Sequence, residues 1–219
     1  MSVEHEGALR LGFFLAAFAL IALAERLRPR RAAAVPRRRR WIDNLGVFAI
    51  SSAAVRLLLP IGEVAFAAWA AQQGWGLFNQ TGWPLWLEFA LAVLALDFVI
   101  YWQHRLFHAV PLLWRLHQMH HADLDHDLTT GSRFHPLEIV LSACIKLAAV
   151  AALGASPVAV LAFAVLLNVC AVFNHSNWSL PIGLDARLRL LLAPFRDPNR
   201  LTLPWMLALP FLRRKSSVD

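Results

Sequence analysis

The chain has 219 residues, 58% of them hydrophobic, and a formal net charge of +7. This apolar fraction is well above the roughly 45–50% of a soluble domain, so it excludes an ordinary water-soluble protein and predicts a membrane protein. The positive charge does not indicate a nucleic-acid partner, because eight arginines are concentrated between Arg26 and Arg40, directly after an apolar segment. That position is typical of the basic flank of a membrane helix, with binding of anionic lipid as the alternative.

Five apolar segments each approach or exceed the roughly 20 residues that cross a bilayer as a helix. They predict an all-α fold, which is a polytopic membrane helical bundle with about four to five transmembrane helices. The segments cover residues 9–24, 45–71, 83–102, 137–153 and 157–173. The second contains Pro60 and Gly62 and is expected to be kinked. A three-residue "GAS" connection separates the last two and predicts a tight helical hairpin. A further apolar run at 203–212 is too short to span a bilayer.

The arginine-rich segment also predicts the topology, because basic flanks favour the cytoplasmic side of a membrane. When the helices are counted from there, residues 104–135 and 174–176 emerge together on that side. The bias toward arginine and alanine indicates a bacterial source. We therefore expect an integral protein of a bacterial inner membrane, with its histidine-rich segments facing the cytoplasm.

Five histidines form two groups with helical spacing. His104 and His108 are four residues apart in "HRLFH", and His117, His120 and His121 follow in "HQMHH". Each group falls on one face of a helix, and neutral imidazole is a good ligand for iron, zinc, copper or nickel. Because burying five imidazoles near a membrane without partners would be costly, the sequence predicts a metal site.

Other polar residues are candidates for the same site. His175, in "FNHSN", is the first choice for a sixth ligand, His135 is a weaker candidate, and His126 is expected to be solvated. Asp97 lies seven residues before His104 on the same helical face, where it could hydrogen-bond a ligand histidine or make an ordinary polar contact between helices. The acidic residues of the loop "ADLDHD" could orient a ligand in the same way. They are Asp123, Asp125 and Asp127.

The number of histidines favours one kind of metal site over another. A structural zinc site is closed by four ligands and prefers cysteine alongside histidine, whereas five or more histidines suit a redox-active or dinuclear centre. A bis-histidine haem is the alternative. It would need two axial ligands and would leave the "HQMHH" group unexplained.

Residues 97–138 together with "FNHSN" at 173–177 closely resemble the sterol desaturase and fatty acid hydroxylase superfamily, whose members are membrane enzymes with a dinuclear iron centre in three histidine boxes. The first box, His-x3-His, matches His104 and His108. The second, His-x2-His-His, matches His117, His120 and His121. The resemblance implies iron as cofactor, a lipid substrate hydroxylated or desaturated with dioxygen, and an external electron donor. It implies these five histidines, with His175, as iron ligands.

The third box of the superfamily has no counterpart at its usual place, because no histidine follows His175. The sequence divides into an N-terminal membrane region (1–90) with the basic loop 26–40, a hydroxylase-like domain (91–195) and an atypical tail (196–219), which suggests a frameshift or early truncation. Asp197 and Asn199 are weak candidates for replacement ligands. We expect about one bound metal and little or no hydroxylase activity. A non-catalytic membrane protein and a haem-binding electron-transfer subunit remain the alternatives.

Overall fold

The computed structural model describes residues 3–123, 125–181 and 183–184. These residues form seven α-helices and two 3-10 helices and contain no strand, so the predicted all-α fold is confirmed. The helices are α1 (Val3–Leu27), α2 (Arg37–Leu58), α3 (Glu63–Gln72), α4 (Leu85–Ala109), α5 (Pro111–His121), α6 (Pro136–Leu153) and α7 (Pro157–His175), with η1 (Phe78–Gln80) and η2 (Leu128–Ser132).

Five stretches of these helices are long and apolar enough to cross a membrane, as predicted. They are Gly7–Leu27, Arg37–Gln72, Leu85–Ala109, Pro136–Leu153 and Pro157–His175. Large apolar side chains such as Leu57 and Leu85 stand exposed on the outer faces of the bundle. Such faces suit a hydrocarbon solvent rather than water. The protein is therefore an integral membrane protein.

Two expected breaks in the helices are present. The second apolar segment divides into α2 and α3 at residues 59–62, where Pro60 lacks a backbone N–H for the helical ladder and Gly62 begins the next helix. The hairpin between α6 and α7 turns at Gly154, which takes the left-handed conformation with φ 69°. The Ser156 hydroxyl then accepts the Ala159 N–H and caps α7.

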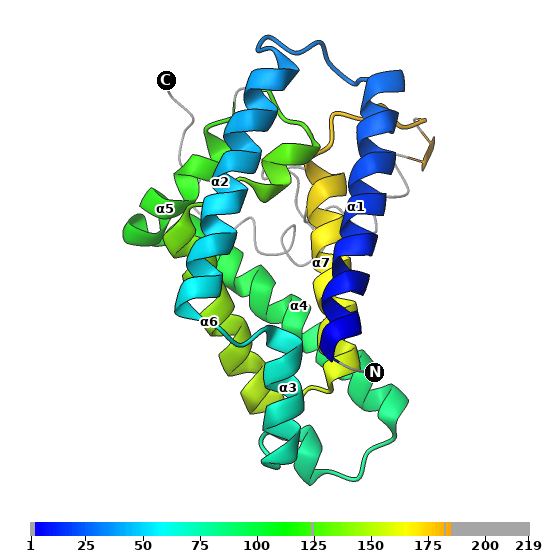
Figure 1. Ribbon diagram of the computed structural model, residues 1–219, viewed down its shortest axis with the longest axis vertical. Coiled ribbons are helices and arrows are strands. Elements are labelled where there is room, and N and C mark those ends of the chain that lie inside the picture. Colours follow the sequence, from blue (N-terminus) through cyan, green and yellow to red (C-terminus); the bar gives the residue numbers. More distant parts are fainter. Residues whose placement is uncertain (1–2, 124, 182, 185–219) are drawn as a thin grey trace, which may run out of the picture.

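The larger apolar core and the histidine boxes lie in different parts of the bundle. An apolar core made by α3, α4, α6 and α7 includes Leu96, Val150, Val160 and Phe163. The end of the bundle that holds the α1–α2 connection also holds α5, η2 and the last turn of α7 (Figure 1). The arginine-rich segment and the histidine boxes thus share one end of the molecule, as the topology argument predicted, while the side of the membrane stays a prediction.

Candidate metal centre

Six histidines from three helices form one continuous cluster at this end. The buried His117 lies at its centre, with the ring centroids of His104, His108 and His121 at 4.7, 4.8 and 4.9 Å. The His120 ring follows at 5.3 Å on the other side of His117. Ligand nitrogens of His104, His108 and His117 all lie within 4.8 Å of one another, so this group could hold a metal ion. The structure therefore brings the two predicted boxes together.

His175 joins the cluster from the last turn of α7. Its Nε2 lies 2.9 Å from Nε2 of His120, although the two residues are 55 positions apart in the chain. His126 is exposed, with its ring centroid 6.4 Å from that of His175. His135 instead caps α6, where its Nδ1 accepts the Leu137 N–H at 3.2 Å. Of the three further histidines, His175 is thus the one in contact with the boxes.

Hydrogen bonds on the outer side of the rings determine which nitrogen faces the cluster. Nδ1 of His120 lies 3.2 Å from the Arg133 carbonyl oxygen, and Nδ1 of His175 lies 2.7 Å from the Ala171 carbonyl oxygen. Since a carbonyl oxygen can only accept, both Nδ1 atoms must donate. In a neutral imidazole the other nitrogen, Nε2, is then an unprotonated acceptor. The Nε2 lone pairs of these two rings therefore face each other across 2.9 Å.

The surroundings keep the rings in the form that binds metal. Burial and then the neighbouring His175 and His117 rings lower the pKa of His120 far below its ordinary value. Burial, followed by His117 and His108, lowers the pKa of His121 to about 4. Both imidazoles are therefore neutral near pH 7, which is the ligand form. Facing lone pairs repel one another, and a shared cation removes that repulsion, so the arrangement fits a metal ion.

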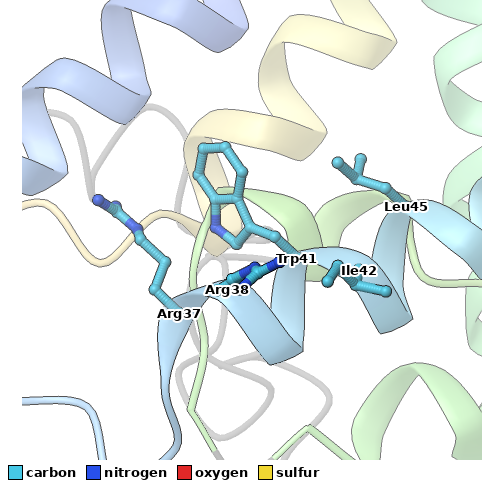
Figure 2. Close-up of a pocket in the computed structure, with 5 residues that line it drawn as sticks. All are labelled: Arg37, Arg38, Trp41, Ile42 and Leu45. Atoms are coloured by element: carbon cyan, nitrogen blue, oxygen red, sulfur yellow. The ribbon is translucent and has the colours of Figure 1, made fainter.

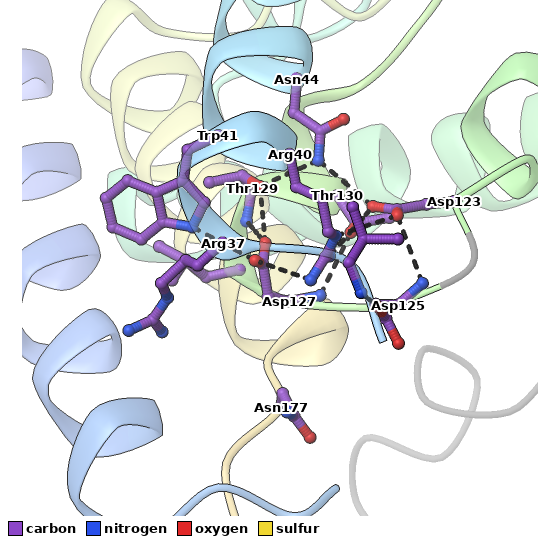
Figure 3. A network of polar contacts seen from close by, with 12 residues as sticks. Arg37, Arg40, Trp41, Asn44, Asp123, Asp125, Asp127, Thr129, Thr130 and Asn177 are labelled. Carbon is purple, nitrogen blue, oxygen red and sulfur yellow. Dashed lines mark hydrogen bonds and ion pairs between the residues drawn. The ribbon is translucent and has the colours of Figure 1, made fainter. Parts of the chain in front are cut away.

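The acidic loop after α5 serves a different purpose from the one expected. Asp123 and Asp127 both pair at 3.2 Å with Arg40 of α2, a buried member of the arginine-rich segment (Figure 3). The expectation that these aspartates orient ligand histidines is therefore wrong. Burial alone would raise the pKa of Asp123, but hydrogen bonds from Thr130 and Asn44 and the charge of Arg40 lower it overall. Asp125 accepts the Val35 N–H at 2.7 Å.

A carboxylate of α1 also closes this end of the bundle. Oε1 of the buried Glu25 in α1 accepts the Leu128 N–H at 2.8 Å and the Asn177 N–H at 2.7 Å, while Oε2 pairs with Arg37. This carboxylate joins α1 to η2 and to the segment after His175. The arginine-rich segment is thus more than a membrane flank, because two of its members fix buried carboxylates.

The segment after the acidic loop is pressed against the histidines. The Phe134 ring stacks on His120 with centroids 4.3 Å apart and 5° between the ring planes. Gly131 approaches α7 so closely that a Cβ there would stand 2.7 Å from the Ala171 oxygen and 3.2 Å from His175 Nδ1. The motif "TTGSRFHP" therefore places a small residue where the chain passes the cluster.

A carboxylate that sequence reasoning missed contacts the central histidine. Oε1 of Glu138, in the first turn of α6, lies 2.7 Å from Nδ1 of His117, and both side chains are buried. The signal was available, because an acidic residue follows the "RFHP" motif by two positions. Asp97, the expected partner, is exposed on α4 and forms no hydrogen bond with a histidine in the described residues.

One surface groove lies along α2 and contains no histidine. It has a volume of about 700 Å³ and is lined along α2 by two arginines of the basic segment and three apolar residues (Figure 2). These are Arg37, Arg38, Trp41, Ile42 and Leu45. It is therefore separate from the histidine cluster.

Comparison with known proteins identifies the region around the cluster. Residues 89–195 match the family model "Fatty acid hydroxylase". This part of the chain is therefore similar to the fatty acid hydroxylase family. This confirms the resemblance carried by the two histidine boxes. The absent third box is not tested, because residues 185–219, with Asp197, Asn199 and the apolar run at 203–212, lie outside the described residues.

Curated relatives agree with this family. Alkylglycerol monooxygenase of Xenopus tropicalis is 45% identical over 51 residues, which cover 23% of this chain and 10% of the relative. The Homo sapiens protein of the same name is 37% identical over 70 residues, covering 32% and 16%. Ornithine lipid hydroxylase OlsE of Rhizobium tropici is 29% identical over 170 residues, covering 73% and 51%. The chain thus spans about half or less of these relatives, and no solved structure matches it significantly.

Proposed function

We propose that the protein is an iron-dependent oxidoreductase that hydroxylates a lipid within a membrane. The family supports this reaction class, and the names of the relatives state lipid substrates, an alkylglycerol and an ornithine lipid. The observation that carries the proposal is the cluster of six neighbouring imidazoles, with Nε2 atoms as close as 2.9 Å, at one end of an apolar helical bundle.

In this proposal the six histidines hold iron through their inward nitrogens. They are His104, His108, His117, His120, His121 and His175. Iron would supply the activation of dioxygen, with electrons from an external donor. The chain itself fixes the imidazoles, because outward hydrogen bonds set the rotation of the rings. The exposed His104 and His108, on the last turns of a membrane-spanning helix, leave a side of the cluster open to a lipid.

The location follows from the same argument. We infer a bacterial inner membrane protein whose cluster faces the cytoplasm, since the arginine-rich segment shares that end of the bundle and positive residues favour the cytoplasmic side. An electron donor in the cytoplasm could then reach the cluster directly.

Iron content and absorption of the purified full chain test the metal assignment. We expect non-haem iron without a Soret band, and a loss of that iron in His120→Ala. The exposed His126→Ala is the matched control and should keep its iron. A Soret band would favour the haem alternative. Equal iron content in wild type and His120→Ala would refute the assignment of the boxes.

Activity is tested separately in membranes that contain the chain. Supplied with iron, dioxygen, a reductant and mixed ether, acyl and amino-acid lipids, they should yield a hydroxylated lipid that the His120→Ala membranes do not. This outcome would differ from the inactivity expected from the absent third box. Mass spectrometry detects the product as a gain of one oxygen. Bound iron without any histidine-dependent product would contradict the proposed reaction and favour the non-catalytic alternative.

A further inference from the structure

The start of α6 gives Glu138 a fixed place beside the cluster. His135 caps the helix and Pro136 opens it, so Glu138 occupies the third helical position. The partial positive charge of a helix N-terminus stabilises a carboxylate there. Its side chain is 5% exposed, and that of His117 is 0% exposed. A buried carboxylate is therefore held in contact with the central ring.

The partner of this carboxylate distinguishes it from the other buried acids. Glu25 pairs with Arg37, and Asp123 and Asp127 pair with Arg40. The half-buried Glu63 pairs with Lys146. Glu138 pairs instead with the His117 imidazole, and its second oxygen, Oε2, is buried without a hydrogen-bond partner in the described part of the chain. Because a buried, under-satisfied carboxylate is costly, a stabilising role alone does not explain it.

We propose that Glu138 is a positioning residue for the metal centre. Its Oε1 accepts the Nδ1–H of His117, which directs the Nε2 lone pair of that ring toward His121, whose Nε2 lies 3.2 Å away. It also places a carboxylate beside the imidazole cluster, where it favours a divalent cation and makes the attached imidazole a stronger ligand. The inference rests on the proposed metal site.

Two substitutions separate the hydrogen bond from the charge. Glu138→Gln keeps an acceptor for the Nδ1–H and removes the charge, whereas Glu138→Leu removes both. Glu63→Gln is the matched control, because it removes a carboxylate that pairs with Lys146 and not with a histidine. Binding of Co²⁺ to the purified full chain is measured by its visible absorption, which reports the ligand field, and the melting temperature is measured without metal.

The expected loss of Co²⁺ affinity is about 10–100-fold for Glu138→Leu, in the range found for groups that orient metal ligands, and smaller for Glu138→Gln. Both variants should shift the absorption bands of bound Co²⁺. The metal-free melting temperature of Glu138→Gln should stay at or above the wild-type value, since a buried charge is removed. Glu63→Gln should bind Co²⁺ as the wild type does.

A double-mutant cycle decides whether the effect passes through His117. In a His117→Ala background, Glu138→Gln should cost no further affinity. The inference would be overturned if Glu138→Gln lowered the Co²⁺ affinity equally with and without His117. It would also be overturned if the loss of metal-free stability matched the loss of affinity, because Glu138 would then have a merely structural role. Unchanged Co²⁺ affinity and spectrum in Glu138→Leu would do so directly. A wild-type chain that binds no Co²⁺ would overturn the proposed metal site and, with it, the role of Glu138.

Discussion

Gly131→Ala tests whether the close passage of the loop shapes the histidine cluster. The added Cβ would stand 2.7 Å from the Ala171 oxygen and 3.0 Å from the Ala171 carbonyl carbon. Both neighbours are backbone atoms of α7, so they cannot rotate away as a flexible side chain would. The Ala171 oxygen is also the acceptor that orients His175 through its Nδ1–H at 2.7 Å. The substitution should therefore affect the proposed ligand His175 as well as the fold.

Overpacking of this kind typically costs about 1–3 kcal/mol. If that cost falls on the orientation of His175, the affinity for metal should fall by about 5–150-fold, at 1.4 kcal/mol for each factor of ten. Thermal unfolding of the metal-free chain measures the cost to the stability of the fold. Co²⁺ titration measures the loss of metal affinity. Gly46→Ala, in α2, is the control, because its Cβ meets no atom within 4 Å. It should be neutral or slightly stabilising, as expected for alanine in a helix. Wild-type melting and Co²⁺ affinity in Gly131→Ala would refute the reasoning by showing that the loop can withdraw freely.

Three further predictions follow from the polar end of the bundle. Arg40→Gln leaves two buried aspartates without their cation and should destabilise the protein by about 3–5 kcal/mol in chemical unfolding, whereas the exposed Arg39→Gln should change little. Glu25→Ala removes the acceptor of two backbone N–H groups and should cost about 1–3 kcal/mol per group left unsatisfied, seen as a lower melting temperature. Reporters fused after Arg40 and Ser132 should both indicate the cytoplasm and one at Gln80 the opposite side. If the reporters after Arg40 and Ser132 lay on opposite sides of the membrane, the arginine-rich segment and the histidine boxes could not share one membrane face.

Much of the fold was predictable because membrane helices carry strong local signals. Length and hydropathy indicated the spans, Pro60 and Gly62 indicated the break between α2 and α3, and Gly154 indicated the hairpin. The start of α2 was less predictable. Its first turn consists of arginines, which hydropathy assigns to a loop, yet Arg40 is buried because two aspartates more than 80 residues later neutralise it. Such pairing at long range leaves no local trace in the sequence.

The site shows the same division between local and long-range information. Spacing was sufficient to place the two boxes on helical faces, since His104 and His108 share α4 and the second box lies on α5. The contact of His175 with His120 depends on how α7 packs against the cluster. The sequence could therefore indicate His175 only as the first choice for a sixth ligand. The roles of the carboxylates were misjudged, because proximity in sequence favoured the acidic loop while the contact with His117 comes from Glu138, 21 residues further along the chain.

The region that matches the family does not contain everything that holds the cluster together. All six histidines lie within residues 89–195, but the loop that packs on them is held by Arg40 of α2 and Glu25 of α1. His120 depends on this loop, since its Nδ1–H donates to the Arg133 carbonyl and its ring stacks on Phe134. The first two helices supply none of the six histidines. They act on the cluster by fixing the loop backbone that contacts it. We therefore expect substitutions in them to weaken metal binding at the proposed centre without touching a histidine. The part of the chain that builds the histidine cluster is larger than the region that matches the family.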